Sequence, residues 1–593
     1  MTATEVQHRF LRADAAQHAR RAGLEPRSLC GEGKAEPLIE SAVEFEEPRS
    51  CFLAHAASIR RMDRRQAWLE ARRYPEQELR LARRVLEDVE AGIDVAEALR
   101  RHPLPNGGFL GKHALVRALR QGAVDAPMGD ILRRIRMKPV RTLSGVTTVT
   151  VLTKPYPCPG QCVFCPTDTR MPKSYLPDEP GARRALEHAF DPYDQTRSRL
   201  EALEAIGHPT AKVELLILGG TWSAYRRDYQ VWFVRRCLDA LNGFDSASLA
   251  EAQSANARSR RRNVGLVIET RPDHIDADEI AHLRRLGVTK VQIGAQSLDD
   301  RILALNQRGH TVADLRRAAA WLRSAGFKIV LHWMPNLLGA TPESDRADFA
   351  RLWADEDLRP DEIKIYPCQL LRNAELYNHW YRGDYHPYTT ETLVDLLADI
   401  KPTIPPYCRV NRVIRDIPST NVVEGNRRTS LRLDAQRELA RRGERCRCIR
   451  CREVREASID PDRLRMHVDT FRAAGGLEHF VSLVTDDDRL AAYLRLWLPG
   501  NASPHPGLPD VEGSARVREL HVYGQSLEFG DASGGAAQHS GLGAALMARA
   551  EELARGAGFA RVAVIAALGT RLYYERLGYR LGETYMVREL ARA

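Results

Sequence analysis

The sequence predicts an α/β protein in which a partial (β/α)6 barrel precedes a smaller C-terminal α/β domain. Short β-branched runs alternate with helical patterns between residues 138 and 401, and this alternation indicates a parallel sheet. Three cysteines follow the first of these runs. A second group of strands and helices, with a glycine-rich turn, occupies residues 457–593. The 593 residues are enough for several domains with buried cores.

The composition is typical of a cytoplasmic protein. The eleven cysteines are clustered and are not spaced as a disulfide framework, which favours a reducing compartment. The sequence has no signal peptide and no uninterrupted apolar run of about 18 residues, so we expect no membrane association. A net charge of +10 favours a polyanionic partner. Nothing in the sequence indicates an obligate protein partner.

The N-terminal part is basic. We expect residues 1–57 to form a poorly ordered extension, because they show no periodicity. Residues 58–137 are predicted to form helices that bind nucleic acid, since arginine forks match phosphate geometry, and an exposed Phe109 would stack on a base. The alternative is a solvated face with the arginines paired to acids. The basic positions are Arg60, Arg61, Arg64, Arg65, Arg72, Arg73, Arg80, Arg83 and Arg84, interspersed with Trp68 and Tyr74.

Residues 138–401 are predicted to form the barrel. Its expected strands are residues 146–152, 213–218, 264–268, 290–293, 328–331 and 362–365. In such barrels the chemistry lies at the C-terminal ends of the strands. The polar or glycine-rich segments 269–271, 294–297 and 332–335 follow three of these strands and are therefore candidates for the site.

The strongest motif is C-x3-C-x2-C at Cys158, Cys162 and Cys165, in the loop after the first strand. Three thiolates on a cubane of four irons leave one iron open, which is a catalytic feature. Phe164 would place an aromatic ring beside whatever binds there. The alternatives are a zinc knuckle or buried structural thiols.

Residues 402–456 are predicted to form a basic linker with a zinc site. Cys446, Cys448 and Cys451 fit one zinc ion with a fourth ligand from elsewhere. We favour Cys368, at the end of the last predicted barrel strand, because a strand end is rigid; Cys408 is the other choice. Unligated surface thiols are the alternative.

Residues 457–593 are predicted to form the C-terminal α/β domain. Residues 479–484, 490–498, 515–523 and 562–566 have strand patterns. A glycine-rich turn opens the helix predicted at 544–557, and the exposed N–H groups of such a turn attract phosphate. The next helix carries Tyr573 and Tyr574.

These motifs carry three resemblances. The cysteine spacing resembles the radical S-adenosylmethionine (SAM) superfamily. In that family a Gly-Gly segment such as Gly219, Gly220 and Thr221, after the second strand, contacts SAM. The order strand, glycine-rich turn, helix, strand, helix in residues 515–579 looks like the GNAT acetyltransferase fold. The combination resembles the catalytic subunit of Elongator in its single-chain prokaryotic form, most densely at residues 191–197, 269–273, 306–310 and 569–574.

The resemblance implies an enzyme that forms 5-carboxymethyluridine at the tRNA wobble position from acetyl-CoA. A 4Fe-4S cluster on the three cysteines would reduce SAM, and the resulting radical would take a hydrogen from the acetyl methyl group. The basic N-terminal helices and the arginines after Pro406 would hold the anticodon stem-loop with the uridine flipped out. The resemblance also implies that Lys212 and two segments of the C-terminal domain bind acetyl-CoA, with Tyr573 or Tyr574 near the thioester. The two segments are Glu519, Leu520, His521 and Val522, and Gln538, His539, Ser540, Gly541, Leu542 and Gly543.

Two other functions compete with this hypothesis. The first is a protein lysine acetyltransferase whose cluster is structural. The basic charge of the chain disfavours a groove for basic tails. The second is a tRNA-binding scaffold, but such a relic would be expected to have lost a cluster cysteine or the glycine-rich turn, and neither is lost.

Overall fold

The computed structural model describes residues 74–123, 128–142, 144–455, 457, 459–524 and 541–591. The chain divides into two units, Met1–Tyr74 and Pro75–Ala593, and everything below concerns the second. The predicted extension 1–57, the arginines from Arg60 to Arg73 with Trp68, and Gln538, His539 and Ser540 lie outside the described residues.

Four helices precede the barrel: α3 (Glu76–Glu90), α4 (Val95–Arg101), α5 (Lys112–Arg120) and α6 (Met128–Ile135). Their cores are apolar, with Val85, Leu86 and Leu115 fully buried, and Arg83 and Arg84 are exposed on α3. The predicted basic helices are therefore present in the described part of this region. None of the described helices combines the length and the apolar character that a bilayer span requires.

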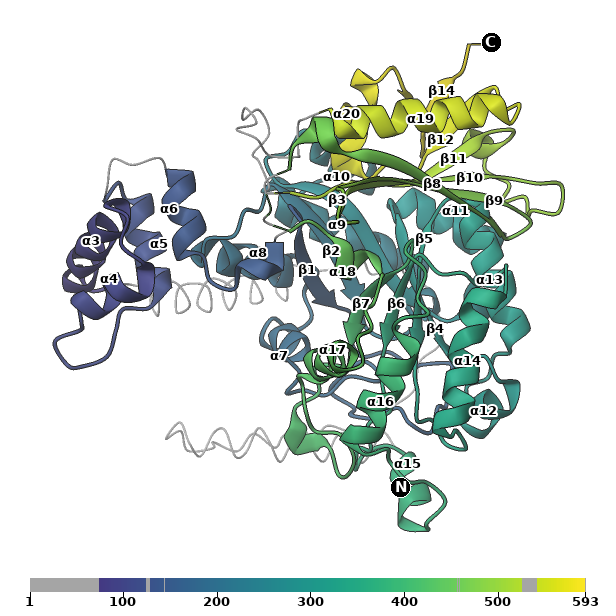
Figure 1. Ribbon diagram of the computed structural model, residues 1–593, viewed down its shortest axis with the longest axis horizontal. Helices are drawn as coiled ribbons and strands as arrows, with labels where there is room; N and C mark the ends of the chain where they lie inside the picture. The colour runs from purple at the N-terminus through teal and green to yellow at the C-terminus, as the bar shows by residue number, and fades with distance from the viewer. Residues whose placement is uncertain are drawn as a thin grey trace, which may run out of the picture. The chain divides into compact units, whose positions relative to one another are not determined.

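The predicted partial parallel barrel is confirmed, with seven strands in sequence order (Figure 1). The strands are β1 (Thr147–Leu152), β2 (Lys212–Leu218), β3 (Arg262–Thr270), β4 (Lys290–Gln296), β5 (Lys328–Trp333), β6 (Glu362–Ile365) and β7 (Arg409–Val413). The prediction of six strands was one short. Strand β7 has the sequence RVNRV, and its charged residues hide the strand pattern.

Helices connect and cover these strands. They are α7 (Pro180–Glu187), α8 (Pro192–Ala205), α9 (Arg227–Asn242), α10 (Leu249–Asn256), α11 (Ala277–Leu286), α12 (Asp300–Leu305), α13 (Val312–Ser324), α14 (Pro342–Ala354), α15 (Leu376–Tyr381), α16 (Thr390–Ile400), α17 (Leu431–Arg441) and α18 (Ile449–Arg452).

The alternation of side chains along β2 shows which face of the sheet packs against the helices and which face lines the barrel lumen. In β2, Val213, Leu215 and Ile217 are buried in the main hydrophobic core, which also contains the apolar residues of α9. The intervening residues Glu214 and Leu216 point the other way, because successive side chains of a strand alternate between its two faces. Glu214 and Leu216 line cavities at opposite ends of the barrel, so this second face is the barrel lumen.

The C-terminal domain has a seven-stranded sheet in the order β13-β14-β12-β11-β10-β9-β8, and it lies across one end of the barrel (Figure 1). Its strands are β8 (Arg465–Ala473), β9 (Gly476–Val484), β10 (Leu490–Leu498), β11 (Ala515–Val522), β12 (Arg561–Val564), β13 (Arg580–Leu581) and β14 (Met586–Glu589). Its helices are α19 (Leu542–Gly556) and α20 (Arg571–Arg576). Strands β8, β13 and β14 were not predicted, because β8 is largely exposed and the last two are short.

Candidate functional site

The three motif cysteines lie in one wall of a cavity at the C-terminal ends of the barrel strands. The cavity has a volume of about 400 Å³ and is lined by Cys158, Cys162, Phe164 and Cys165. Cys162 is buried, whereas the other two thiols are partly exposed. The loop folds on itself through a backbone hydrogen bond of 3.1 Å from the N–H of Cys165 to the carbonyl of Cys162.

The Gly-Gly segment borders the same cavity. Gly219 and Gly220 have φ values of +141° and +90°, a region that side-chain-bearing residues rarely adopt. A Cβ atom on Gly219 would lie 1.8 Å from the hydroxyl oxygen of Thr153, so no larger residue fits there. Gly220 and Thr221 line the cavity, and the Thr221 hydroxyl lies 3.8 Å from the sulfur of Cys158. The structure therefore brings both predicted motifs to one place.

Two buried arginines contact the cysteine loop. Nη1 of Arg308 donates to the sulfur of Cys162 at 3.4 Å, and Arg271 lies beside Gly160. The pKa of the Cys162 thiol is lowered to about 5, first by its hydrogen bond with Cys165, against burial, and then by the charges of Arg308 and Arg271. This environment favours the thiolate, which is the form that binds metal.

A polar chain of side chains lines the cavity on its other side. The Tyr175 hydroxyl donates to Glu269 at 3.1 Å, and Nδ1 of His332 lies 3.5 Å from the other oxygen of that carboxylate. Nε2 of His332 lies 2.9 Å from the amide oxygen of Gln292, which also accepts from Lys364. Burial, and then the charge of Lys364, hold the pKa of His332 well below its usual value, so this imidazole is neutral near pH 7. Glu269 and His332 were predicted as site residues because they follow predicted strands. No local sequence pattern indicated that Tyr175 and Lys364 belong to the site.

A second cavity lies at the opposite end of the barrel, against the C-terminal domain. It also has a volume of about 400 Å³. The barrel side is lined by residues from the beginnings of strands, including Lys290, Lys328 and Glu362. The C-terminal domain contributes Glu519, Leu520, His521 and Tyr574. Several predicted acetyl-CoA residues therefore share this cavity with charged barrel residues.

Strands β11 and β12 diverge beside this second cavity. They pair only from Ala515 to Val517 on β11, so no described strand pairs with residues 519–522 on that side. Pairing with β10 on the other side continues to Val522. A free strand edge offers N–H and C=O groups to an extended ligand.

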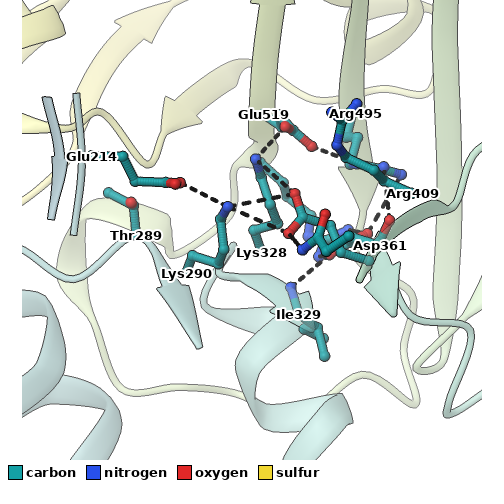
Figure 2. Close-up of polar contacts among 12 residues, drawn as sticks. Glu214, Thr289, Lys290, Lys328, Ile329, Asp361, Arg409, Arg495 and Glu519 are labelled. Atoms are coloured by element: carbon teal, nitrogen blue, oxygen red, sulfur yellow. Dashed lines mark hydrogen bonds and ion pairs between the residues drawn. The ribbon is translucent and has the colours of Figure 1, made fainter. Parts of the chain in front are cut away.

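Charged side chains around the second cavity form ion pairs, and Figure 2 shows the pair of Lys290 and Glu214. The ammonium of Lys290 lies 2.7 Å from Glu214 and 3.3 Å from Glu362. Lys328 bonds to Glu519, which also accepts from Arg495 at 2.9 Å (Figure 2). Burial, opposed in part by Glu519, lowers the pKa of His521 to about 3, and its Nε2 has no hydrogen-bond partner among the described residues.

Other predicted acetyl-CoA residues lie next to this cavity or away from it. Gly541 caps α19 with a φ of +79°, and a Cβ atom on Gly543 would lie 2.6 Å from the hydroxyl oxygen of Tyr573. That hydroxyl is buried and has no hydrogen-bond partner within the described chain. Lys212 is the first residue of β2 and does not line the second cavity. The lysines that line this cavity are Lys290 and Lys328. Leu542, at the start of α19, is packed in the core, and Val522 does not line the cavity.

The linker cysteines form a compact group. The ligand atoms of Cys446, Cys448 and Cys451 all lie within 4.8 Å of one another, and this is the one such group of His, Cys, Asp or Glu within the ranges that the structure describes. The sulfur atoms of the motif cysteines Cys158, Cys162 and Cys165 do not all lie within 4.8 Å of one another. A single tetrahedral ion requires a compact set, whereas a four-iron cluster spans more.

The expectation that Cys368 completes the zinc set is corrected. Cys368 follows β6 at its C-terminal end and lines the first cavity, in a cluster with Cys162 and Phe164. The linker thiols lie near Cys408, which precedes β7 at the opposite end of the sheet and whose carbonyl accepts from the N–H of Ile449. The buried ammonium of Lys401 has no hydrogen-bond partner in the described chain, and its positive charge acts on these thiols.

Comparison with known proteins finds family models that match the barrel region and relatives that match most of the chain. Residues 156–352 match the radical SAM superfamily, and residues 360–441 match the radical SAM C-terminal domain. A tRNA uridine(34) acetyltransferase of Dehalococcoides mccartyi is 42% identical over 455 residues, which cover 76% of this chain and 99% of the relative. Elongator complex protein 3 of Homo sapiens is 36% identical over 478 residues, which cover 78% of this chain and 87% of the relative.

A solved structure supports the same assignment. The archaeal Methanocaldococcus infernus Elp3 with an N-terminal deletion (1–46) is 36% identical, with a TM-score of 0.66, and the match covers 75% of this chain and all of that one. The resemblance expected from the motifs is thereby confirmed. The chain belongs to the family of the tRNA uridine(34) acetyltransferases and Elongator complex protein 3.

Proposed function

We propose that this protein converts the wobble uridine of tRNA into 5-carboxymethyluridine, with acetyl-CoA as the source of the two-carbon group and SAM as the radical source. The observation that carries the proposal is the pair of cavities at opposite ends of one barrel. One contains the cysteine motif of the radical SAM superfamily, and the other is formed with the C-terminal domain. Relatives named for acetyl transfer to uridine 34 of tRNA support the substrate.

Cys158, Cys162 and Cys165 would hold a 4Fe-4S cluster. These sulfurs do not form a set within 4.8 Å, and two arginines lie beside their loop, which fits a cluster better than a single zinc ion. With SAM bound, the cluster supplies a one-electron reductant and thereby a carbon-centred radical. Gly220 and Thr221 would let SAM approach the backbone, because no side chain at position 220 stands in the way.

The polar chain of the first cavity would orient the flipped uridine. Glu269 is held by the Tyr175 hydroxyl on one side and faces His332 on the other. The neutral imidazole of His332 and the ammonium of Lys364 offer hydrogen bonds without placing two positive charges together. Such groups suit the carbonyl and N–H edges of a uracil ring.

Acetyl-CoA would bind along the free edge of β11 between Glu519 and His521. The glycine turn at Gly541 and Gly543 presents the N-terminus of α19 to its phosphates, which fits the attraction of a helix N-terminus for anions. His521 is neutral near pH 7, and its Nε2 has no hydrogen-bond partner among the residues that the structure describes, so this nitrogen would hydrogen-bond the thioester or a hydrolytic water. Tyr574 lines this cavity and Tyr573 stands beside the glycine turn, so we assign the thioester end to Tyr574.

Three further assignments complete the proposal. The tRNA would contact exposed arginines such as Arg83 and Arg84, with Phe109, which is 56% exposed, available for base stacking. Cys446, Cys448 and Cys451 would bind zinc. The described cysteines are all unpaired, which supports a cytoplasmic location.

The test is an anaerobic incubation of the reconstituted full chain with SAM, dithionite, acetyl-CoA and bulk tRNA. Mass spectrometry of the nucleosides should find 5-carboxymethyluridine only when every component is present, together with 5′-deoxyadenosine. Cys162→Ala should abolish both products and leave acetyl-CoA binding intact. Deoxyadenosine without the modified uridine would contradict the RNA substrate. Lysine acetylation of a protein substrate that survives Cys162→Ala would support the acetyltransferase alternative.

A further inference from the structure

Arg308 is built into the wall behind the cysteine loop. It lies between α12 and α13 and is only 7% exposed. Its segment is tied to the loop, because the carbonyl of Asn306 accepts a 3.2 Å hydrogen bond from the N–H of Val163. The side chain of Asn306 is itself held by the N–H and the carbonyl of Leu338, at 3.2 and 3.0 Å. The guanidinium is therefore presented to the loop from a rigid base.

Gly294 fixes the direction in which Arg308 points. Nη2 of Arg308 donates to the carbonyl of Gly294 at 2.7 Å, which leaves Nη1 directed to the sulfur of Cys162 at 3.4 Å. A Cβ atom on Gly294 would lie 2.4 Å from Nη2. Because glycine is the one residue without that atom, the missing side chain at position 294 creates the space in which the guanidinium lies.

Arg271 places a second positive charge against the same loop. Its Nε and Nη2 donate to the carboxylate of Asp273 at 2.9 and 2.8 Å. Its Nη1 has no hydrogen-bond partner among the described residues, although Arg271 is only 4% exposed. This nitrogen would lie 2.3 Å from a Cβ atom on Gly160, which stands between Cys158 and Cys162. A buried donor without a partner is costly, and a group bound to the loop would satisfy it.

We propose that Arg308, assisted by Arg271, is a positioning residue that raises the reduction potential of the cluster held by Cys158, Cys162 and Cys165. The inference rests on the proposed assignment of the cluster to these thiols. Reduction adds one negative charge to the cluster. A nearby cation and an N–H donor to a ligand sulfur stabilise the reduced form more than the oxidised form. Removing Arg308 should make the cluster harder to reduce.

The charge of the cysteine ligands gives a physical reason for the two arginines beside the loop. With a cluster bound, the three cysteines would contribute thiolate charge at one side of the first cavity. Without a compensating cation, the extra electron would add to that charge in a medium of low polarity. Arg308 and Arg271 place positive charge against these ligands, and Asp273 in turn partly neutralises Arg271. Among the described residues, no carboxylate lies within ion-pair distance of Arg308, so its charge is the more effective one.

The experiment measures the midpoint potential of the cluster in the anaerobically reconstituted full chain, without SAM. Wild type, Arg308→Met, Arg308→Lys and Arg301→Met are compared by dithionite titration with an EPR readout. Arg301 is a matched control, because it is an exposed arginine on the neighbouring helix α12. Iron content and visible absorbance are measured first for each protein.

At the wild-type midpoint, Arg308→Met is expected to be about tenfold less reduced, a shift of about 59 mV for one electron. Arg308→Lys keeps the positive charge, so its midpoint potential should shift less. The midpoint potential of Arg301→Met should equal that of wild type. Arg308→Met with full iron content and an unchanged midpoint would overturn the inference. If wild-type protein holds no cluster on these cysteines, the proposed function itself fails, which is a different result.

A second variant decides the case in which Arg308→Met does not retain iron. Gly294→Ala keeps the arginine but moves its guanidinium away from Cys162, because the new methyl group would occupy its place. The midpoint of Gly294→Ala should shift in the same direction as that of Arg308→Met. A wild-type midpoint in Gly294→Ala would overturn the role of the contact.

Discussion

Arg518 of β11 and Asp361, which directly precedes β6, form a two-pronged ion pair between the C-terminal domain and the barrel. The two nitrogens of the guanidinium lie 3.0 and 2.5 Å from the two carboxylate oxygens, and both side chains are at most 1% exposed. Arg518 also bonds to Glu478, and Asp361 lies 3.5 Å from Arg495 (Figure 2 shows Asp361 and Arg495). The second cavity borders this network, since Arg518 and Glu519 both line it.

The first prediction concerns stability. Arg518→Met leaves Asp361 and Glu478 buried with one cation fewer, and loss of one partner of a buried pair costs roughly 3–5 kcal/mol. Urea denaturation at pH 7, followed by circular dichroism, should show that loss in the unfolding free energy. Arg549→Met is the control, because the Arg549–Glu552 pair is exposed and contributes about 0–1 kcal/mol. Equal effects of the two variants would contradict the prediction.

The second prediction concerns the stability of the protein at low pH. Burial alone would raise the pKa of Asp361, but Arg518, Arg495 and Arg323 outweigh it and lower the pKa to about 2. The unfolded value is about 3.9. The carboxylate therefore contributes about 2.6 kcal/mol of stability, which is present above about pH 4 and is lost as the pH falls toward 2.

Unfolding free energies of wild type and Asp361→Asn, measured in urea between pH 2 and 6, test this sign. The variant should be less stable at pH 6, and its stability should fall less steeply between pH 4 and 2. Parallel curves for the two proteins would show that Asp361 does not carry this pH dependence.

The third prediction concerns acetyl-CoA. Gly543→Ala would place a methyl group 2.6 Å from the hydroxyl oxygen of Tyr573, so the ring must move away from the glycine turn. We expect affinity for a non-hydrolysable acetyl-CoA analogue to fall about tenfold by calorimetry, which is about 1.4 kcal/mol. Gly556→Ala, at the other end of α19, meets no atom within 4 Å and should bind normally. Normal binding by both variants would remove the glycine turn from the site.

The fourth prediction concerns zinc. Cys448→Ser should lose the bound zinc and keep iron, because its thiol belongs to the compact group near β7. Cys368→Ser should keep the zinc, since Cys368 lines the cavity at the other end of the barrel. Elemental analysis of both purified variants by mass spectrometry measures the molar ratios of zinc and iron to protein. Zinc loss in Cys368→Ser would reinstate that residue as the fourth ligand.

Local patterns were sufficient for much of this protein. The apolar alternation of β2 and the three closely spaced thiols are properties of short segments, so the barrel and the cysteine loop could be predicted. The glycine pair at 219–220 was likewise predicted beside that loop, because parallel neighbouring strands end at one edge of a sheet. By contrast, β7 was missed, since tertiary pairing with β6 outweighs the poor strand propensity of its charged residues.

Other features were decided only by tertiary structure. Arg308 and Cys162 are 146 positions apart, and no local signal joins them; the closure of the barrel does. The strand-end position of Cys368 favours it as a zinc ligand, but sequence spacing does not say which end of the sheet a distant thiol group occupies. The sequence by itself thus determined which chemical groups the chain carries and the strands that present them. The folded barrel decided which of these groups face one another, because contacts between distant segments depend on how the strands pack and not on the order of residues within each one.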